Sequence, residues 1–170
     1  MPATLALYTM KKRYAYKRQQ RTIGSFVKIP IDSTYHTYAR ILRDASFAFY
    51  DSRTKEDISD LSKIASSPIL FIVAVFNDAV TRGRWVKVGK LRLEPHLLKL
   101  PPKFIRDSID PTQFSIYEFG KIRPATREEC QGLERAAVYE PRNVEERLRD
   151  HYAGRPNRDV EEDKRDLSGQ

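Results

Sequence analysis

One run of eight apolar residues, Ile69 to Phe76, constrains the fold of this chain more than any other feature. Branched and aromatic side chains dominate the run, and its length suits a buried strand, whereas a membrane-spanning helix needs about 20 apolar residues. It therefore predicts a central strand that is covered on both faces and anchors the core. We expect one soluble domain, because 170 residues with 40% hydrophobic content are enough for a single core.

Five further segments have the alternation or the β-branched and aromatic content of strands. They are Ser25–Ile31, Tyr35–Leu42, Phe47–Tyr50, Trp85–Leu91 and Phe114–Phe119. The residues Asp32-Ser33-Thr34 separate the first two and predict a hairpin turn. Pro30 places the first strand at a sheet edge or ends it there, because proline cannot donate a ladder hydrogen bond.

Helical spacing appears in two places. Residues 57–66 predict a short amphipathic helix that Pro68 stops, with apolar positions at Ile58, Leu61, Ile64 and Ala65. A second helix is bounded by Pro141 and Gly154, with apolar residues at Val144, Leu148 and Tyr152 on one face. Between them, Thr126 and Glu129 have capping-box spacing and predict a short helical turn broken near Gly132.

These elements predict an α+β, predominantly β fold. We expect an antiparallel, partly open, barrel-like sheet with the short mid-chain helix and the C-terminal helix packed on it. Residues 24–154 form the single domain in this interpretation. Residues 1–23 form a basic, flexible N-terminal arm, and residues 155–170 form a polar C-terminal tail that frays.

Much of the net charge of +8 lies in the arm. Residues 1–23 carry six basic side chains and no acidic one, interleaved with Tyr8, Tyr14 and Tyr16. Lysine and arginine neutralise phosphates and tyrosine rings stack on bases, so the arm favours nucleic-acid binding as one function. The alternative is a solvated, partly disordered leader, because so short a basic stretch is a weak signal.

The sequence carries no recognisable catalytic, metal or cofactor motif. The histidines His36, His96 and His151 lie in separate contexts without a second ligand at metal-binding spacing. Seven glycines include neither a phosphate-binding loop nor a dinucleotide fingerprint, so we expect no cofactor. A thiolate–imidazole pair of Cys130 and His151 is the one catalytic alternative, against which a buried structural cysteine weighs more.

Targeting signals are also lacking. The N-terminus has no extended apolar segment after its basic cluster, so it does not have the order of a signal peptide. Cys130 is the single cysteine and cannot form an internal disulfide, which favours a reducing cytoplasm.

Charged residues beside apolar segments supply the candidate site. Arg40, Arg84 and Asp51 adjoin aromatic or β-branched residues, where burial would force them to find partners. Glu134 and Arg135, with Arg147 and Asp150, can extend such a network between the last helix and the sheet. Trp85, the only tryptophan, serves as core filler or as an interface anchor. An internal bracing network and direct partner contacts both remain open for these residues.

Several stretches resemble the immunity protein 26 family of bacterial polymorphic toxin systems, over about Thr22 to Gly154. The matching residues are Ile29-Pro30-Ile31, Tyr35-x-x-Tyr38-Ala39-Arg40-Ile41-Leu42, Ala48-Phe49-Tyr50-Asp51, Ser67-Pro68-Ile69-Leu70-Phe71, Gly83-Arg84-Trp85, Pro124-Ala125-Thr126-x-x-Glu129-Cys130-x-Gly132-Leu133-Glu134-Arg135-Ala136-Ala137-Val138 and Val144-Glu145-x-Arg147-Leu148-Arg149-Asp150-His151-Tyr152-Ala153-Gly154. The last two stretches are the most specific. Ser33-Thr34, where a glycine-containing turn is expected, and the basic N-terminal extension depart from the pattern.

The resemblance implies a cytoplasmic, predominantly β protein without catalytic activity. Such a protein protects its bacterium by binding a cognate toxin domain. Within the resemblance, Tyr35, Tyr38, Arg40, Asp51, Arg84, Trp85, Glu134 and Arg135 are the candidate residues for partner binding or for a structural charge network. A nucleic-acid-binding β domain that uses the N-terminal arm is the alternative function, and the sequence predicts no oligomeric state.

Overall fold

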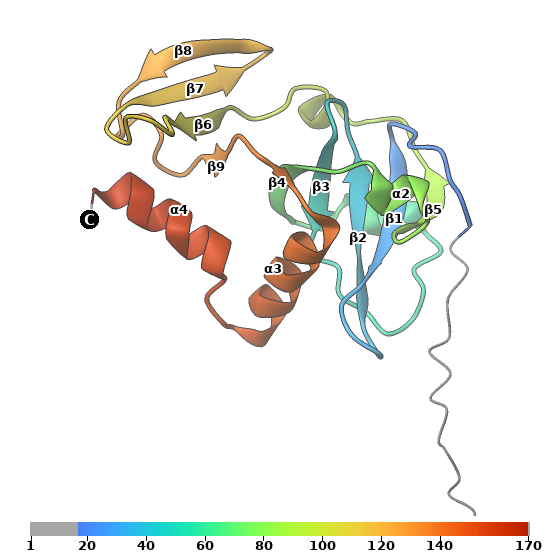
Figure 1. Cartoon of the computed structure of the whole chain (residues 1–170). Coiled ribbons are helices and arrows are strands. Elements are labelled where there is room, and N and C mark those ends of the chain that lie inside the picture. The colour runs from blue at the N-terminus through green and yellow to red at the C-terminus, as the bar shows by residue number, and fades with distance from the viewer. Residues whose placement is uncertain (1–16, 170) are drawn as a thin grey trace, which may run out of the picture.

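The computed structural model describes residues 17–169, which fold into two sheets with helices packed on them (Figure 1). The strands are β1 (Ser25–Pro30), β2 (His36–Ile41), β3 (Ser46–Tyr50), β4 (Ile69–Val75), β5 (Val86–Lys90), β6 (Lys103–Arg106), β7 (Phe114–Glu118), β8 (Lys121–Ala125), β9 (Glu134–Arg135) and β10 (Val138–Tyr139). The helices are α1 (Leu61–Ala65), α2 (Asp78–Thr81), the 3-10 helix η1 (Pro95–Leu97), α3 (Pro141–Ala153) and α4 (Arg158–Ser168).

The first sheet has the strand order β10-β4-β3-β2-β1-β5, and all its pairs are antiparallel except β10 with β4. Its strands alternate between two buried faces, as the pleat requires. On one face, Phe47, Phe49 and Trp85 pack with Val144 and Leu148 of α3. The other face packs on α1 through a second cluster, which consists of Phe26, Tyr38, Tyr50 and Ile64.

Side chains and backbone geometry fix the two hairpins that begin this sheet. The Asp32 carboxylate accepts hydrogen bonds from the amides of Thr34 and Tyr35, both at 2.7 Å, which closes the β1–β2 turn without a glycine. The β2–β3 turn has positive φ at Asp44 (52°) and Ala45 (57°), the pattern of a two-residue type I′ hairpin. The predicted turn at 32–34 is thus confirmed.

The second sheet has the order β8-β7-β6-β9, with a parallel pair between β6 and β9. One face of it packs on α4, where Phe104, Phe114 and Ile116 surround Cys130 and Leu167. The second sheet lies beside the end of the first sheet that carries β4, and the chain passes from β9 through β10 into α3 (Figure 1). The two sheets are therefore joined by short segments rather than by a continuous ladder.

The α+β, predominantly β class is confirmed, and the ten strands form two mixed sheets that do not close into a barrel. The C-terminal helix is confirmed as α3, which Gly154 ends with a φ of 67°. The mid-chain helix is shorter than 57–66 because the Asp60 side chain caps it, accepting a hydrogen bond from Ser62 N. Thr126 and Glu129 form both hydrogen bonds of a capping box, although only turns follow.

Three expectations need correction. The apolar run forms β4, but β4 lies second from an end of its sheet, and Phe76 is 48% exposed. Residues 155–170 do not fray over their whole length, because α4 forms there and buries Leu167. Residues 17–23, which the sequence assigned to a flexible arm, contact the domain: Gln19 N donates to Thr81 O at 3.2 Å. The rest of the arm, residues 1–16, lies outside the described residues.

Candidate functional site

Arg40 lies in β2 and has no exposed surface. Its Nε donates to Gly24 O at 2.7 Å, its Nη2 donates to Leu91 O at 2.8 Å, and its Nη1 lies 3.2 Å from a carboxylate oxygen of Glu94. The guanidinium also lies over the Phe26 ring, 4.1 Å from the ring centre. These contacts join β1, β2 and the segment after β5. The charge of Arg40 is therefore used within the protein and is not presented to a partner.

Arg84 and Trp85 meet at Glu145 of α3, which is 6% exposed. One carboxylate oxygen of Glu145 accepts from Arg84 Nε at 2.7 Å and from Trp85 Nε1 at 2.9 Å. The other oxygen accepts from Arg84 Nη2 at 2.7 Å. The Trp85 ring has edge contacts with Phe47 and Phe49 at 5.3 and 5.8 Å between ring centres. The contact ties α3 to the start of β5.

Glu134 and Arg135 pair with different helices. Arg147 of α3 donates to both carboxylate oxygens of Glu134, at 3.0 and 2.7 Å. Arg135 Nε donates to Asp163 of α4 at 2.6 Å, and its Nη2 donates to Asp166. Burial raises the pKa of Asp163, and the hydrogen bond from Arg135 opposes that rise. The expected extension through Asp150 does not join this group, because Asp150 pairs with Arg155 at 3.1 Å.

The remaining three candidates lie in or near the first half of β2 and just after the end of β3. Tyr38 is buried, and its hydroxyl accepts a hydrogen bond from Ile58 N at 2.9 Å. Tyr35 is partly buried, and the Arg53 guanidinium lies 4.5 Å from its ring centre. Asp51 is exposed just after β3. The eight candidates therefore occupy several separate places and do not converge on one cleft.

Sequence reasoning identified Glu134 but missed the other acidic partners in these contacts. Glu145 follows Val144 on the buried side of α3, and that position is the signal that could have identified it. Asp163 and Asp166 lie in residues 155–170, for which the sequence predicts a frayed tail. A frayed tail would not supply ion-pair partners to the domain.

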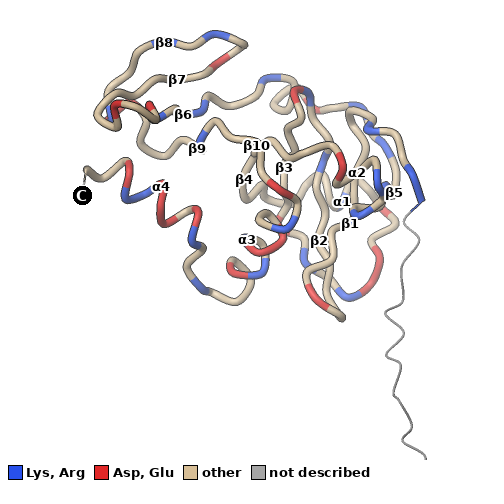
Figure 2. Tube along the Cα trace, in the orientation of Figure 1, with Lys and Arg blue, Asp and Glu red and all other residues tan. Residues whose placement is uncertain are grey.

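Basic side chains gather on one edge of the first sheet. Residues 17–23 and 82–92, which we call the basic edge, contain eight basic residues and no acidic one. The basic residues are Lys17, Arg18, Arg21, Arg82, Arg84, Lys87, Lys90 and Arg92. β5 is the terminal strand of the sheet at this edge, and Figure 2 shows the basic segments side by side there. Every charge within these two segments is positive, and Glu145 of α3 pairs with one of them, Arg84.

The side-chain amide of Gln19 positions the N-terminal segment on this edge. Gln19 Nε2 donates to Val80 O at 3.0 Å and to Trp85 O at 2.9 Å, and Gln19 Oε1 accepts from Lys87 N at 2.8 Å. Nothing in the sequence marked this glutamine, because its partners lie more than 60 residues away. Three hydrogen bonds from one amide fix residues 17–23 beside α2 and β5.

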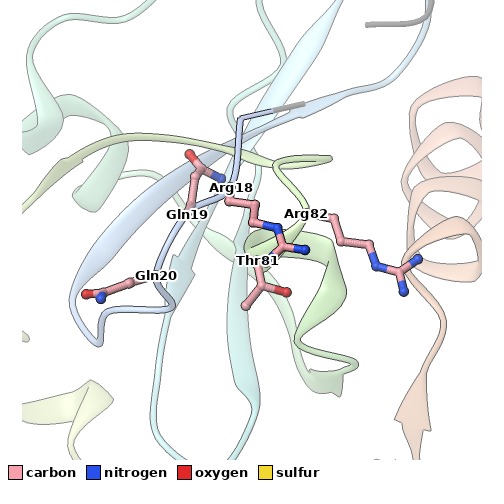
Figure 3. A pocket seen from close by; sticks show the side chains of 5 residues that line it. All are labelled: Arg18, Gln19, Gln20, Thr81 and Arg82. Atoms are coloured by element: carbon pink, nitrogen blue, oxygen red, sulfur yellow. The ribbon is translucent and has the colours of Figure 1, made fainter. Parts of the chain in front are cut away.

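A pocket of about 530 Å³ opens where this segment passes α2. It is lined by Arg18, Gln19, Gln20, Thr81 and Arg82 (Figure 3). Arg18 and Arg82 make no hydrogen bond or ion pair through their side chains with other residues in 17–169, and both are exposed. Two such guanidiniums beside a pocket can bind carboxylates or phosphates, because each presents several donors in a fixed plane.

The catalytic alternative has no geometry to support it. Cys130 is buried against the second sheet, and burial raises the pKa of its thiol. His151 is exposed on α3, where its ring lies against Tyr152.

Among residues 17–169, no group of three or more His, Cys, Asp or Glu residues could hold a metal ion. In the same range, no helix is long and apolar enough to cross a membrane.

The fold and the site define a class: a small β-rich protein in which Arg40, Glu145 and other charges in the core pair internally and basic side chains gather on one sheet edge. Within that class, the chain belongs to the Immunity protein 26 family, whose family model matches residues 22–115. Neither a curated protein nor a solved structure matches the chain. The matched range includes Arg40, Arg84 and Trp85 but ends before Glu134 and Arg135, so the resemblance over residues 116–154 stays a prediction.

Proposed function

We propose that this protein neutralises a cognate bacterial toxin domain by binding it, without catalysis. Membership of an immunity protein family carries the proposal, since it indicates a toxin partner in general. The protein acts in the cytoplasm in this proposal, because a chain with one cysteine has no need of an oxidising compartment.

We place the basic edge in the contact with the toxin. Most charged candidates elsewhere in the fold are engaged internally, whereas Arg18 and Arg82 are exposed beside a pocket. Arginine is common among the residues that dominate binding energy at interfaces. A surface of one sign attracts an oppositely charged surface over a distance and raises the association rate. The toxin surface in this proposal is therefore acidic, over about 800 Å² on each partner.

The first experiment co-expresses this chain with the toxin domain encoded beside its gene. Host survival and co-elution of the pair in gel filtration are the two measurements. Survival with a stable complex supports neutralisation by binding. Survival without a complex contradicts it and indicates chemistry on the toxin or its target, and death of the host contradicts the family inference for that toxin.

Charge reversal locates the contact. The double variant Arg18→Glu/Arg82→Glu should lower the association rate for the toxin by about 10-fold or more and weaken its dependence on salt. Arg158→Glu/Lys164→Glu is the matched control, because it changes the net charge equally on α4, on the opposite side of the molecule (Figure 1). Equal rates for both double variants would exclude the basic edge from the interface.

Nucleic-acid binding through the N-terminal arm is the alternative function. A deletion of the N-terminal arm tests this alternative. The deletion should remove only residues 1–16, because residues 17–23 contact the domain. In the proposed function, this deletion leaves toxin neutralisation intact. Loss of neutralisation together with salt-sensitive RNA or DNA binding by the full chain would favour the alternative.

A further inference from the structure

A cleft of about 600 Å³ lies between the two sheets. The first sheet contributes Ala74 and Val138 from β4 and β10, together with the β2–β3 hairpin. The second sheet contributes the side of β6 and β7 that faces away from α4, with Ile105 and Tyr117. The cleft is separate from the basic edge, since the two share no lining residue.

Lys103, at the start of β6, lies in this cleft and is only 6% exposed. Its ammonium makes no hydrogen bond or ion pair with another residue in 17–169. The opposite charge that acts on it is that of Glu134, which lies opposite Lys103 in the β6–β9 pair. The Glu134 carboxylate is already engaged by two hydrogen bonds from Arg147. Most of the Lys103 side chain is buried, but its ammonium is not among the fully buried atoms that lack a partner, so it remains available to a ligand that enters the cleft.

Large apolar side chains lie exposed around the same cleft. Leu98, Phe119 and Val138 line it and are 56%, 64% and 48% exposed, respectively. They come from three separate segments: the one after η1, the β7–β8 turn and β10. Convergence of exposed apolar residues on one concave surface is typical of an interaction site rather than of solvated surface.

Two turns at the cleft hold residues in a left-handed backbone conformation. Asp44 has a φ of 52° and Phe119 has a φ of 51°, and both line the cleft. This conformation is unfavourable for a bulky side chain such as that of Phe119. Strain of this kind is frequent where a residue is held for contact with a ligand or partner.

We propose that this cleft receives an apolar segment of the toxin that carries one carboxylate, and that the carboxylate pairs with Lys103. The proposal rests on the proposed function and adds a second, chemically distinct contact to it. Charge complementarity selects the segment. Lys103 and Glu118 are the two charged lining residues without an ion pair in 17–169, and Lys103 is the more deeply buried, at 6% exposure. Asp44 is already near a basic group, with an oxygen 3.7 Å from Arg43 Nε. An acidic group flanked by apolar residues satisfies both the ammonium and the exposed side chains.

Lys103→Met tests the pairing, because methionine keeps most of the unbranched side chain and removes the charge. It should weaken toxin binding by about 30-fold or more, chiefly through faster dissociation, while the protein stays folded and at least as stable. Lys121→Met is the matched control, since it removes an exposed lysine from β8, which is separated from β6 by β7, and should leave affinity within about two-fold. Equal affinities of wild type and Lys103→Met for a toxin that binds would overturn the cleft proposal and leave the proposed function standing.

A second measurement does not depend on the toxin. The peptide acetyl-Leu-Asp-Leu-amide, titrated to about 10 mM, should produce saturable NMR shifts at the Lys103 side chain and at the methyl groups of Leu98 and Val138. The neutral Leu-Asn-Leu peptide and the Lys103→Met variant should not. Absence of these shifts overturns the proposal, and so does concentration-dependent dimerisation that Lys103→Met abolishes, because a second copy would then occupy the cleft.

Discussion

Glu145 and Arg84 are joined at two points: Arg84 Nε and Nη2 donate to the two carboxylate oxygens of Glu145, each at 2.7 Å. The same carboxylate accepts a hydrogen bond from the buried Trp85 indole at 2.9 Å. Arg84 keeps 44% of its side chain exposed, whereas Glu145 keeps 8%. The pair therefore connects the core of the first sheet to the solvent-exposed basic edge through α3.

Glu145→Ala should lower the free energy of unfolding by about 2–4 kcal/mol, because it leaves the Trp85 indole N–H buried without an acceptor and removes the partner of Arg84. Urea unfolding measures the loss. Glu146→Ala, at the exposed neighbouring position, is the control and should leave the midpoint unchanged. A Glu145→Ala protein as stable as the control would show that the contact does not brace the fold.

Arg135→Ala should loosen α4 from the second sheet. Arg135 donates to both Asp163 and Asp166, so its loss leaves two largely buried carboxylates with fewer partners. We expect a loss of about 1–3 kcal/mol in the free energy of unfolding and faster hydrogen exchange over Arg158–Ser168. Arg158→Ala, which removes an arginine with 77% side-chain exposure, should change neither. Unchanged exchange in Arg135→Ala would mean that the other contacts of the helix, among them Arg106 with Asp166 and the packing of Leu167, are enough to hold it.

His36 should make stability sensitive to mild acid. Burial lowers the pKa of His36, with the nearby charge of Lys28 adding to the effect and Asp57 opposing it. The unfolded state therefore binds more protons between the lowered pKa and the ordinary value near 6.5, so stability falls as pH drops through that interval.

The His36→Gln variant should lose less stability than wild type between about pH 6.5 and pH 5, as measured by thermal unfolding across that range. His96→Gln reports the effect of losing an exposed histidine and should follow wild type. If wild type and His36→Gln lose the same stability between these pH values, then the buried imidazole does not cause the loss.

The strands of the first sheet could be predicted because their signals are local. Alternation over Phe47–Tyr50 reflects two buried faces, and the expected strand agrees with β3 within one residue. β9 and β10 have only two residues each, so they carry no periodic pattern and exist through their parallel partners β6 and β4. Long-range pairing of such short segments has no signature in the sequence.

Helix α4 was missed because its apolar stripe is minimal, with Leu167 as its one buried residue. Its stability comes from contacts with another element, through Asp163 and Asp166. Local signals were present nevertheless: Asn157 accepts a hydrogen bond from Val160 N as the N-cap, and Gly169 ends the helix with a φ of 79°. The capping residues are therefore a stronger local signal for this helix than its hydrophobic periodicity, although a frayed tail was predicted here.

The charged residues of the candidate site could be identified from the sequence, and so could the link between Glu134 and Arg147, but the other partners could not. A charge beside aromatic residues predicts burial, which is right for Arg40 and wrong for Arg84, whose side chain is 44% exposed. Arg84 and Glu145 are 61 residues apart, so only the fold joins them. The basic edge combines two segments in the same way, because Gln19 fixes residues 17–23 beside β5.

Lys103 should give wild type and Lys103→Met different pH profiles of stability. Burial lowers the pKa of Lys103, while the charge of Glu134 opposes the shift. Between the lowered pKa and the ordinary value near 10.4, the unfolded state binds more protons, so wild type gains stability as pH rises through that interval. The methionine variant lacks this titration, so its advantage over wild type at pH 7 should shrink toward pH 10. Urea unfolding of both proteins checks this, and an advantage that stays constant or grows with pH would show that the ammonium is not desolvated in the cleft.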